Sequence, residues 1–488
     1  MSKVYIIGTG PGDEELLTLK AVRVLKECTA VLYDRLVSNN VLNYLNENCE
    51  IYYCGKEPGA HSKTQEEINE LLIYLAKKGH IVGRIKGGDP YVFGRGGEEV
   101  IALADEKIAF EVIPGVTSPI AVLNYAGIPI THRGIAQSFH VITGKSAQDL
   151  KVNFKALALE EGTLVFMMGL SNLDNIVNEL VTNGKDLCTP CGVVMRGTSA
   201  KQKKVIGTLD NISQKVKDAN LQSPCIIVVG EVVNLNESLN WYENKPLFGK
   251  NICITRSKKQ SEHLKNKLVE LGAEVTSFNS IEIKNSANNL DNYISKLSEY
   301  NHIVFTSVNS VEIFFDYLIK KDYDIRGIKA KISAIGHATE KALNKRGIIC
   351  FTKAKEFIGE GLVTILKPHL KEYEKLLLPC SCKSREYIYD ELTKTGVEVD
   401  KVHIYDTVCG DIKNKRSFDE VDIVFFTSPS TVKNMVEMLG VEQIKKKKVI
   451  AIGPKTNETL EELGIKTSVC VEHSEEGFLK EIESLSQK

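Results

Sequence analysis

The second half of the chain contains two sequence motifs that each occur twice. "FTSVNSVEIFF" begins at Phe305 and "FTSPSTVKNMV" at Phe426, while "AIGHATEKALNKRGI" begins at Ala334 and "AIGPKTNETLEELGI" at Ala451. Two motifs that recur in the same order at nearly the same separation indicate a duplicated structural unit. In each copy a short apolar strand ends in hydroxyl residues that open a helix, and a second strand ending in glycine follows. The second half is therefore predicted to fold as two similar α/β lobes.

The Ser and Thr residues of these repeats stand where open α/β sheets bind ligands, at the carboxyl ends of strands. Each hydroxyl is also an ordinary helix N-cap, and for any single residue capping is the simpler interpretation. Because both lobes present the same set, the pattern suits a large anionic ligand held in a cleft between them.

The first half opens with "VYIIGTGPGDEELLTLKA", which predicts a buried strand over Val4–Ile7, a glycine turn and a helix over Leu16–Leu25. A dinucleotide-binding loop needs glycine at its first, third and sixth positions. Counted from Gly8, the sixth position is Asp13, and Pro11 removes a backbone N–H that a pyrophosphate would use. The residues leave two alternatives: an ordinary tight turn, or a site for a ligand without a pyrophosphate.

Further motifs of the first half contain a strand-like run that ends at Gly, Asp or Pro. Such ends should gather small and polar residues at one edge of a sheet. In "GRIKGGDPYVFGRGGEE" two glycines allow close approach of backbone to a ligand, and Asp89 could accept a hydrogen bond from a ribose hydroxyl or an ammonium group. A plain Gly-Gly-Asp-Pro turn is the alternative.

Composition narrows the class of protein. The 488 residues are too many for one core, so two to four domains are expected. The 62 Lys and Arg residues nearly balance the 63 Asp and Glu residues, which gives no reason to expect nucleic acid or an acidic membrane as partner. No apolar run is long enough to span a membrane, and the N-terminus does not resemble a signal peptide, so a cytoplasmic protein is expected.

The 12 cysteines are scattered, and many lie inside apolar runs. Only Cys188 and Cys191 form a C-x-x-C motif, and Cys380 and Cys382 form a distant C-x-C motif. A zinc site needs two such pairs in one small unit or histidines at fitting positions. Reduced thiols and no metal are therefore predicted.

The single tryptophan, Trp241, lies in the polar, aperiodic stretch "NLNESLNWYENKPLFGKN". Such a stretch is typical of a linker, and a new strand, turn and helix begin after it. The predicted organisation is a first part over residues 1–240, a linker over 241–249 and a second part over 250–488.

Six motifs of the first part, "GTGPGDEELLTLKA", "YDRLVS", "KGGDPYVFGRGGEE", "PGVTS", "AGIPITHR" and "SPCIIVVGEVV", together resemble the uroporphyrinogen-III C-methyltransferases of the tetrapyrrole methylase family. The resemblance implies two α/β domains, over about residues 1–115 and 116–240, with S-adenosylmethionine in the cleft between them. The residues that it assigns to that pocket are Pro11, Gly87, Gly88, Asp89, Val92, Thr117, Ser118, Met168 and Gly197.

The resemblance also assigns Asp34 as proton acceptor and Lys56 as proton donor. A pyrrole carbon that takes a methyl group must shed or shift a proton, so a carboxylate near it is chemically reasonable. From the residues alone, the simpler interpretations are that Asp34 caps the following turn and that Lys56 is a surface lysine. The substrate carries many carboxylates, and the cations and hydrogen-bond donors proposed to bind them are Arg35, Arg95, His132 and Arg133.

The second part, with its repeats and with "ITRS", "LPCSCKSR" and "VHIYDT", resembles uroporphyrinogen-III synthase. That resemblance implies a first lobe over 250–285 and 403–488, a second lobe over 286–402 inserted into it, and no metal or organic cofactor. Tyr405 stands at the family's key tyrosine, where its phenol could assist departure of a hydroxyl group, although a half-buried structural tyrosine is the alternative. The hydroxyl residues proposed to hold substrate carboxylates are Thr306, Ser307, Ser428, Ser430 and Thr456.

Together the two resemblances predict a bifunctional enzyme of tetrapyrrole biosynthesis. Its second part would close hydroxymethylbilane to uroporphyrinogen III with inversion of the last ring and loss of water. Its first part would methylate that product at C2 and C7 with S-adenosylmethionine to give precorrin-2. Two alternatives are a methylase of another precorrin and a methylase with a non-catalytic, tetrapyrrole-binding second part. The partners expected are small tetrapyrroles, with a homodimer through the methylase part as a family expectation.

Overall fold

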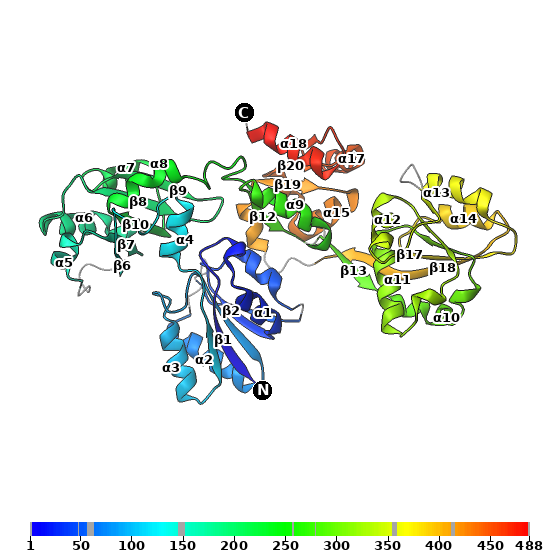
Figure 1. Ribbon diagram of the computed structural model, residues 1–488, viewed down its shortest axis with the longest axis horizontal. Helices are drawn as coiled ribbons and strands as arrows, with labels where there is room; N and C mark the ends of the chain where they lie inside the picture. Colours follow the sequence, from blue (N-terminus) through cyan, green and yellow to red (C-terminus); the bar gives the residue numbers. More distant parts are fainter. Residues whose placement is uncertain are drawn as a thin grey trace. The chain divides into compact units, whose positions relative to one another are not determined.

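The computed structural model describes residues 2–46, 48–55, 63–144, 152–255, 258–278, 280–353, 359–410 and 415–486. The chain divides into two compact units. One unit is Met1–Phe278 together with Ile412–Lys488, and the other is Asn279–Asp411. The four sheets of the described residues are each covered by helices, as the α/β fold class predicts (Figure 1).

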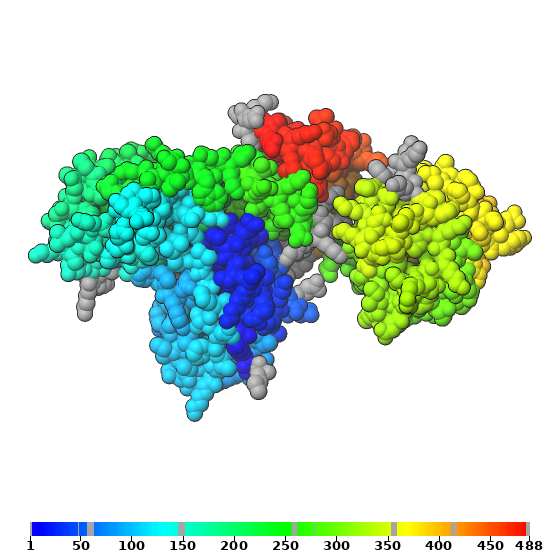
Figure 2. All heavy atoms as spheres, in the orientation of Figure 1, coloured from blue at the N-terminus to red at the C-terminus, as the bar shows by residue number. Residues whose placement is uncertain are grey.

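The first sheet is entirely parallel and has the strand order β3-β2-β4-β1-β5. On β1, Tyr5 and Ile7 face α1, whereas Val4 and Ile6 face α2 and α3. Helices therefore cover both faces, as parallel sheets require. The atoms of this domain are drawn in blue to cyan in Figure 2. The elements are β1 (Lys3–Gly8), α1 (Leu19–Glu27), β2 (Ala30–Tyr33), β3 (Glu50–Tyr53), α2 (Gln65–Lys77), β4 (Ile81–Lys86), α3 (Gly96–Asp105) and β5 (Phe110–Ile113).

The second sheet is mixed, with the order β6-β7-β10-β8-β9. Only β6 and β7 are parallel, and the other neighbours run antiparallel. The elements of this domain are α4 (Ser118–Tyr125), β6 (Phe139–Thr143), α5 (Phe154–Leu159), β7 (Thr163–Met167), α6 (Leu173–Thr182), β8 (Pro190–Met195), β9 (Lys203–Thr208), α7 (Ile212–Asp218), β10 (Cys225–Val229) and α8 (Asn236–Leu239).

The third sheet, in the same unit, is parallel and has the order β12-β11-β19-β20-β21. The chain leaves this sheet after β12 and returns to it at β19, so the second unit is an insertion. The elements are β11 (Asn251–Ile254), α9 (Lys258–Glu270), β12 (Glu274–Ser277), β19 (Ile423–Phe426), α15 (Pro429–Leu439), α16 (Val441–Lys445), β20 (Lys448–Ala451), α17 (Pro454–Glu462), β21 (Thr467–Val469) and α18 (Glu475–Ser486).

The second unit holds the fourth sheet, with the order β13-β18-β17-β14-β15-β16 and one antiparallel pair, β13 with β18. It takes in the predicted second lobe, residues 286–402, together with β13 and the end of β18. The elements are β13 (Ile281–Asn285), α10 (Asp291–Ile294), β14 (His302–Phe305), α11 (Val308–Lys320), β15 (Lys331–Ala334), α12 (His337–Asn344), β16 (Thr352–Lys353), α13 (Gly359–Leu366), β17 (Lys375–Ser381), α14 (Tyr387–Thr393) and β18 (Glu398–Cys409).

The sequence repeat corresponds to a structural repeat. The series β14, α11, β15, α12 of the second unit matches β19, α15, β20, α17 of the third sheet. In both copies a serine caps the first helix: Ser307 Oγ accepts from the N–H of Ser310, and Ser428 Oγ from that of Thr431. The prediction of two similar α/β lobes is confirmed.

The described residues contain neither a candidate membrane span nor a candidate metal site. Within those ranges, none of the helices is both long and apolar enough to cross a membrane. The same residues contain no group of three or more His, Cys, Asp or Glu side chains arranged to hold a metal ion. In the C-x-x-C motif, Cys191 is buried in β8 and Cys188 is exposed.

Candidate active sites

Three glycine-containing turns meet at the carboxyl ends of β1, β4 and β5. The N–H of Gly10 donates to the carbonyl of Gly88 at 3.2 Å, and the N–H of Gly88 donates to that of Gly10 at 2.7 Å. A Cβ atom on Gly8 would lie 2.5 Å from the nitrogen of Gly115, and one on Gly115 would lie 2.2 Å from the Gly88 carbonyl oxygen. Only glycine allows these backbones to approach so closely. The motifs "GTGPGD", "GGDP" and "PGVTS" therefore form one site.

Asp89 is held in this site by two backbone groups. Its Oδ1 accepts from the N–H of Tyr91 at 2.8 Å and its Oδ2 from the N–H of Gly115 at 3.1 Å. A carboxylate can accept about four hydrogen bonds, so Asp89 stabilises the turn and retains acceptor capacity for a ligand. Val92 closes the same turn, since its N–H donates to the Asp89 carbonyl at 3.3 Å.

The remaining residues of the predicted pocket come from the start of α4 and from two loops of the second domain. Thr117 precedes α4, and a Cβ atom on Gly88 would lie 3.3 Å from Ser118 Oγ. Gly197 packs so closely on α4 that a Cβ atom there would lie 2.4 Å from a methyl carbon of Val122. Met168 follows β7 with a φ of 57° and is 44% exposed.

The first and second domains touch at the opening turn. The N–H of Asp13 donates to Thr198 Oγ1 at 3.2 Å, and a Cβ atom on Gly12 would lie 2.9 Å from the same oxygen. The stretch that contains Pro11 therefore lies beside the loop that contains Gly197. These contacts place the "GTGPGD" turn between the first sheet and the second domain.

Asp34 lies just after β2, at the same edge of the first sheet. Its Oδ1 accepts from the N–H of Leu36 at 3.0 Å, which is the turn cap considered from the sequence. Its Oδ2 accepts from Arg84 Nη2 at 3.2 Å, and its side chain remains 29% exposed. Gly87 faces the same loop, because a Cβ atom there would lie 3.0 Å from the Leu36 carbonyl oxygen. Lys56 falls outside the described residues.

The four side chains proposed to bind substrate carboxylates are all exposed. Arg95 has a left-handed backbone (φ 58°) and pairs with Glu98 at 2.7 Å. Arg35 follows Asp34 directly, whereas His132 and Arg133 lie in the turn between α4 and β6. Two charged residues that the sequence analysis missed, Arg84 and Lys86, are buried at this edge. The available signal was the presence of two cations inside the apolar strand "IVGRIKGG".

In the second unit, Tyr405 and Ser307 form a hydrogen-bonded pair. Tyr405 Oη lies 2.9 Å from Ser307 Oγ, and that oxygen also accepts from the N–H of Ser310 at 3.0 Å. Tyr405 is 6% exposed, so it is more deeply buried than the half-buried tyrosine considered from the sequence. Burial raises the pKa of Tyr405, and the hydrogen bond between Tyr405 and Ser307 opposes that rise. Thr306 lies between the end of β14 and Ser307.

The other proposed hydroxyl residues belong to the third sheet. Ser428 Oγ lies 2.9 Å from Ser430 Oγ at the start of α15, and Ser430 is exposed. Thr456, on α17, is only 3% exposed. In each unit, hydroxyl groups stand at the carboxyl end of a strand and the start of a helix, as the repeat predicted.

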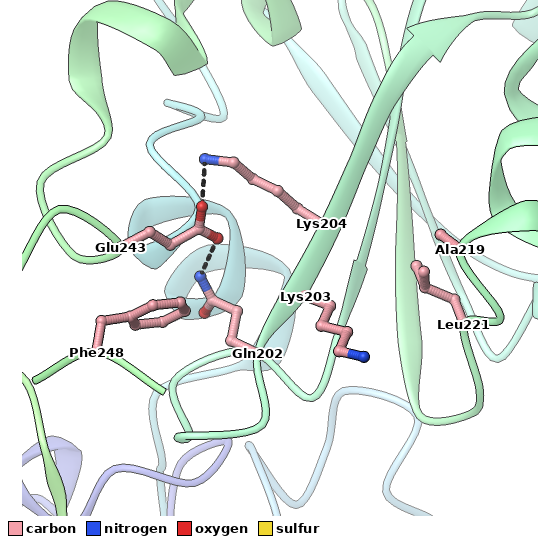
Figure 3. Close-up of a pocket in the computed structure, with 7 residues that line it drawn as sticks. All are labelled: Gln202, Lys203, Lys204, Ala219, Leu221, Glu243 and Phe248. Atoms are coloured by element: carbon pink, nitrogen blue, oxygen red, sulfur yellow. Dashed lines mark hydrogen bonds and ion pairs between the residues drawn. The ribbon is translucent and has the colours of Figure 1, made fainter. Parts of the chain in front are cut away.

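The segment predicted as a linker packs against the second domain. The indole N–H of Trp241 donates to the Asn124 carbonyl at 3.2 Å, and the rings of Trp241 and Tyr242 lie 5.0 and 4.7 Å from that of Tyr125. Glu243 accepts from Gln202 Nε2 at 2.9 Å and pairs with Lys204 Nζ at 3.0 Å (Figure 3). These contacts border a cavity of about 390 Å³, which is lined by Gln202, Lys203, Lys204, Ala219, Leu221, Glu243 and Phe248.

The fold and its sites define a two-part α/β protein, in which a two-domain part with a glycine-lined site precedes a duplicated, two-lobed part. Residues 3–213 match the family model of Tetrapyrrole (Corrin/Porphyrin) Methylases, and residues 262–480 match that of Uroporphyrinogen-III synthase HemD. The porphyrin biosynthesis protein HemD of Ruminiclostridium josui is 36% identical over 477 residues, which cover 96% of this chain and 95% of that protein. The chain therefore belongs to both families, as a fusion of a tetrapyrrole methylase and a uroporphyrinogen-III synthase.

Two further relatives match the first part. A uroporphyrinogen-III C-methyltransferase of Methanocaldococcus jannaschii is 49% identical over 238 residues, which cover 48% of this chain and 98% of that protein. The crystal structure of uroporphyrin-III C-methyl transferase from Thermus thermophilus complexed with S-adenyl homocysteine has 39% identity and a TM-score of 0.42, and covers 48% of this chain and 94% of that chain.

Proposed function

We propose that the chain closes hydroxymethylbilane to uroporphyrinogen III in its second part, and methylates that product at C2 and C7 in its first part to give precorrin-2. One observation carries the proposal: a single chain contains both families, and the product of one activity is the substrate of the other. A relative that matches almost end to end supports the view that the two parts belong together.

The methyl donor proposed is S-adenosylmethionine, and the donor and acceptor groups of the glycine site suit it. The fixed carboxylate of Asp89 can accept from a hydroxyl or ammonium group, and Ser118 Oγ lies beside Gly88. When bound, this molecule supplies a methyl group on a positively charged sulfur. The residues proposed to hold it are Pro11, Gly87, Gly88, Asp89, Val92, Thr117, Ser118, Met168 and Gly197.

In the methylation step, Asp34 is proposed to accept the proton that the methylated ring must lose or shift. Its carboxylate is anchored by the Leu36 N–H and the Arg84 guanidinium, yet its side chain is 29% exposed and can reach a ligand. Because both oxygens are held, the group is already oriented before substrate binds, which is what efficient proton transfer needs. Lys56 is proposed as the proton donor.

The carboxylates of the tetrapyrrole are proposed to bind Arg35, Arg95, His132 and Arg133. Their exposure suits a substrate that enters from solvent. Arg95 already has an anionic partner in Glu98, so a substrate carboxylate must replace that partner or share the guanidinium with it.

In the synthase step, Tyr405 is proposed to donate its phenolic proton to the hydroxyl group that leaves hydroxymethylbilane as water. Burial raises the pKa of Tyr405, so the phenol keeps its proton at neutral pH, as a general acid must. Ser307 holds the phenolic oxygen at 2.9 Å and thereby fixes its direction. Thr306, Ser428, Ser430 and Thr456 are proposed to bind substrate carboxylates.

The test supplies hydroxymethylbilane to the full chain with and without S-adenosylmethionine and identifies the products. Uroporphyrinogen III alone is expected without the methyl donor, and precorrin-2 with it. If only the spontaneously formed isomer I appears, the synthase assignment fails. If uroporphyrinogen III appears but is never methylated, the methylase assignment fails.

A further inference from the structure

A cluster of buried charges lies directly behind Asp34. Arg84 and Lys86 are two residues apart on β4, so their side chains lie on the same face of the sheet. This is the face that packs against α2 and α3. Glu99, on the first turn of α3, accepts from Arg84 Nε at 2.9 Å and from Lys86 Nζ at 2.9 Å. Arg84 is 3% exposed, Lys86 5% and Glu99 0%.

The hydrogen bonds to Glu99 converge on one oxygen. Oε1 accepts from Arg84, from Lys86 and from Gln65 Nε2 at 3.3 Å, whereas the buried Oε2 has no partner among the described residues. Burying ions is unfavourable, and replacing a buried ion pair with apolar residues of similar volume often leaves a protein no less stable. A buried cluster with an unpaired oxygen therefore contributes little to the stability of the domain, which points to a role for its geometry.

The geometry of the cluster fixes Arg84. All three nitrogen atoms of its guanidinium are engaged: Nε with Glu99 at 2.9 Å, Nη1 with the Ile85 carbonyl at 2.9 Å and Nη2 with Asp34 Oδ2 at 3.2 Å. A planar guanidinium held at Nε and Nη1 has no freedom left at Nη2. The position of Asp34 Oδ2 is therefore set from within the protein core.

The charges of the cluster support this arrangement. Burial opposes the charge on Arg84, but Glu99 and Asp34 outweigh it and raise the pKa of Arg84. Burial and the neighbouring Arg84 lower the pKa of Lys86, against the attraction of Glu99. Arg84 thus stays charged, and it keeps Glu99 as partner when Asp34 is neutral. A proton can therefore arrive on Asp34 while Arg84 keeps its hydrogen bond to Glu99.

We propose that Arg84 is a positioning residue for methyl transfer: Glu99 fixes its guanidinium, and the guanidinium holds the Asp34 carboxylate in the orientation in which it takes the proton. The inference rests on the proposed role of Asp34. Lys86 shares Oε1 of Glu99 with Arg84, and the hydrogen bond to Asp34 comes from Arg84.

The test measures methylation of uroporphyrinogen III by the full chain with Arg84→Met and Arg84→Lys. A misplaced catalytic group costs on the order of 100-fold in rate, so Arg84→Met is expected to lower kcat by about that factor while the KM for S-adenosylmethionine changes less than about twofold. Arg84→Lys keeps the positive charge but loses the planar guanidinium with its several donors. Its rate is therefore expected to lie between those of Arg84→Met and the wild type. Equal rates for the two variants and the wild type would overturn the proposal.

A double-mutant cycle with Asp34→Asn separates positioning from a merely structural role. In the Asp34→Asn background, Arg84→Met is expected to cost less than about threefold, because the group that it positions is already inactive. A further loss as large as in the wild type would overturn the positioning role and leave Asp34 as proton acceptor. If Asp34→Asn itself methylates at the wild-type rate, the proposed function of Asp34 fails, and this inference with it.

Two controls keep the result interpretable. Uroporphyrinogen III formation by the same chain and binding of S-adenosylhomocysteine verify that each variant is folded. Lys77→Met removes an exposed ion pair with Glu106 in the same domain and is expected to leave methylation unchanged.

Glu99→Gln is a second variant for the case in which Arg84→Met fails these folding controls. It keeps the shape of the side chain but removes the charge that fixes Arg84, so it is expected to lower kcat with the same dependence on Asp34. Equal kcat for Glu99→Gln and wild type would overturn the proposal.

Discussion

The phenol of Tyr125 donates a hydrogen bond of 2.8 Å to Oδ2 of Asp13, and so joins α4 to the turn after β1. The N–H of Asp13 donates in turn to Thr198, and its Oδ1 accepts from the N–H of Glu15 at 2.9 Å. Asp13 therefore connects three segments. This is the physical reason for an aspartate where a dinucleotide-binding loop has glycine.

Replacing Tyr125 with Phe is expected to destabilise the methylase part and to weaken binding of S-adenosylhomocysteine. The ring would still pack on Trp241 and Tyr242, but Asp13 would lose one donor, at a cost of about 1–3 kcal/mol for a partly buried hydrogen bond to a charged group. Denaturant unfolding and calorimetric titration measure the two effects. Tyr74→Phe, at a half-exposed position on α2, is the control. Unchanged stability and affinity in Tyr125→Phe would show that the bond to Asp13 supports neither the fold nor the site.

Trp241 is expected to report ligand binding by its fluorescence, because it is the single tryptophan of the chain. Its ring contacts Tyr125, whose hydroxyl is bonded to Asp13 in the turn proposed to bind S-adenosylmethionine. Titration with S-adenosylhomocysteine should therefore change the emission, and Tyr125→Phe should reduce the change. A constant emission at saturating ligand, verified by calorimetry, would contradict this coupling.

Tyr405→Phe is expected to slow formation of uroporphyrinogen III by tenfold or more, since general acid catalysis typically contributes about 10²–10⁴-fold. Ser307→Ala should have a smaller effect in the same direction, because it leaves the phenol in place but removes the oxygen at 2.9 Å. Separating isomers III and I by chromatography measures the enzymatic fraction. Tyr373→Phe, at an 88% exposed position in the same unit, is the control. An unchanged proportion of isomer III in Tyr405→Phe would remove Tyr405 from the mechanism.

Local patterns were enough to predict the sheets and the meeting of the three glycine turns. The repeated "FTS" and "AIG" motifs predicted β14 and β19 with their helices because short apolar runs and N-caps are encoded by neighbouring residues. The three glycine turns could be placed together because parallel strands end at the same edge of a sheet, and Gly8, Gly88 and Gly115 do meet there.

Contacts between distant side chains were not predictable in this way. The Arg84–Glu99 pair depends on how α3 packs on β4, and the residues of the motif "GRIKGGDP" do not by themselves indicate that packing. Trp241 and Tyr242 lie in a polar, aperiodic stretch, so nothing local indicates that they pack on Tyr125. The depth at which Tyr405 is buried likewise depends on the elements that cover β18.

The pH dependence of the synthase activity tests the protonation state of Tyr405. Burial raises its pKa above the ordinary tyrosine value of about 10, so the phenol remains protonated, and able to donate, throughout the range from pH 7 to 9. The ratio of the wild-type rate to the Tyr405→Phe rate is therefore expected to stay constant across that range, even if both rates vary through other groups. Isomer III formation at a series of pH values, with the spontaneous reaction subtracted, gives this ratio. A ratio that falls steadily as the pH rises would mean that Tyr405 loses its proton below its ordinary pKa, which is incompatible with its burial and with its role as proton donor.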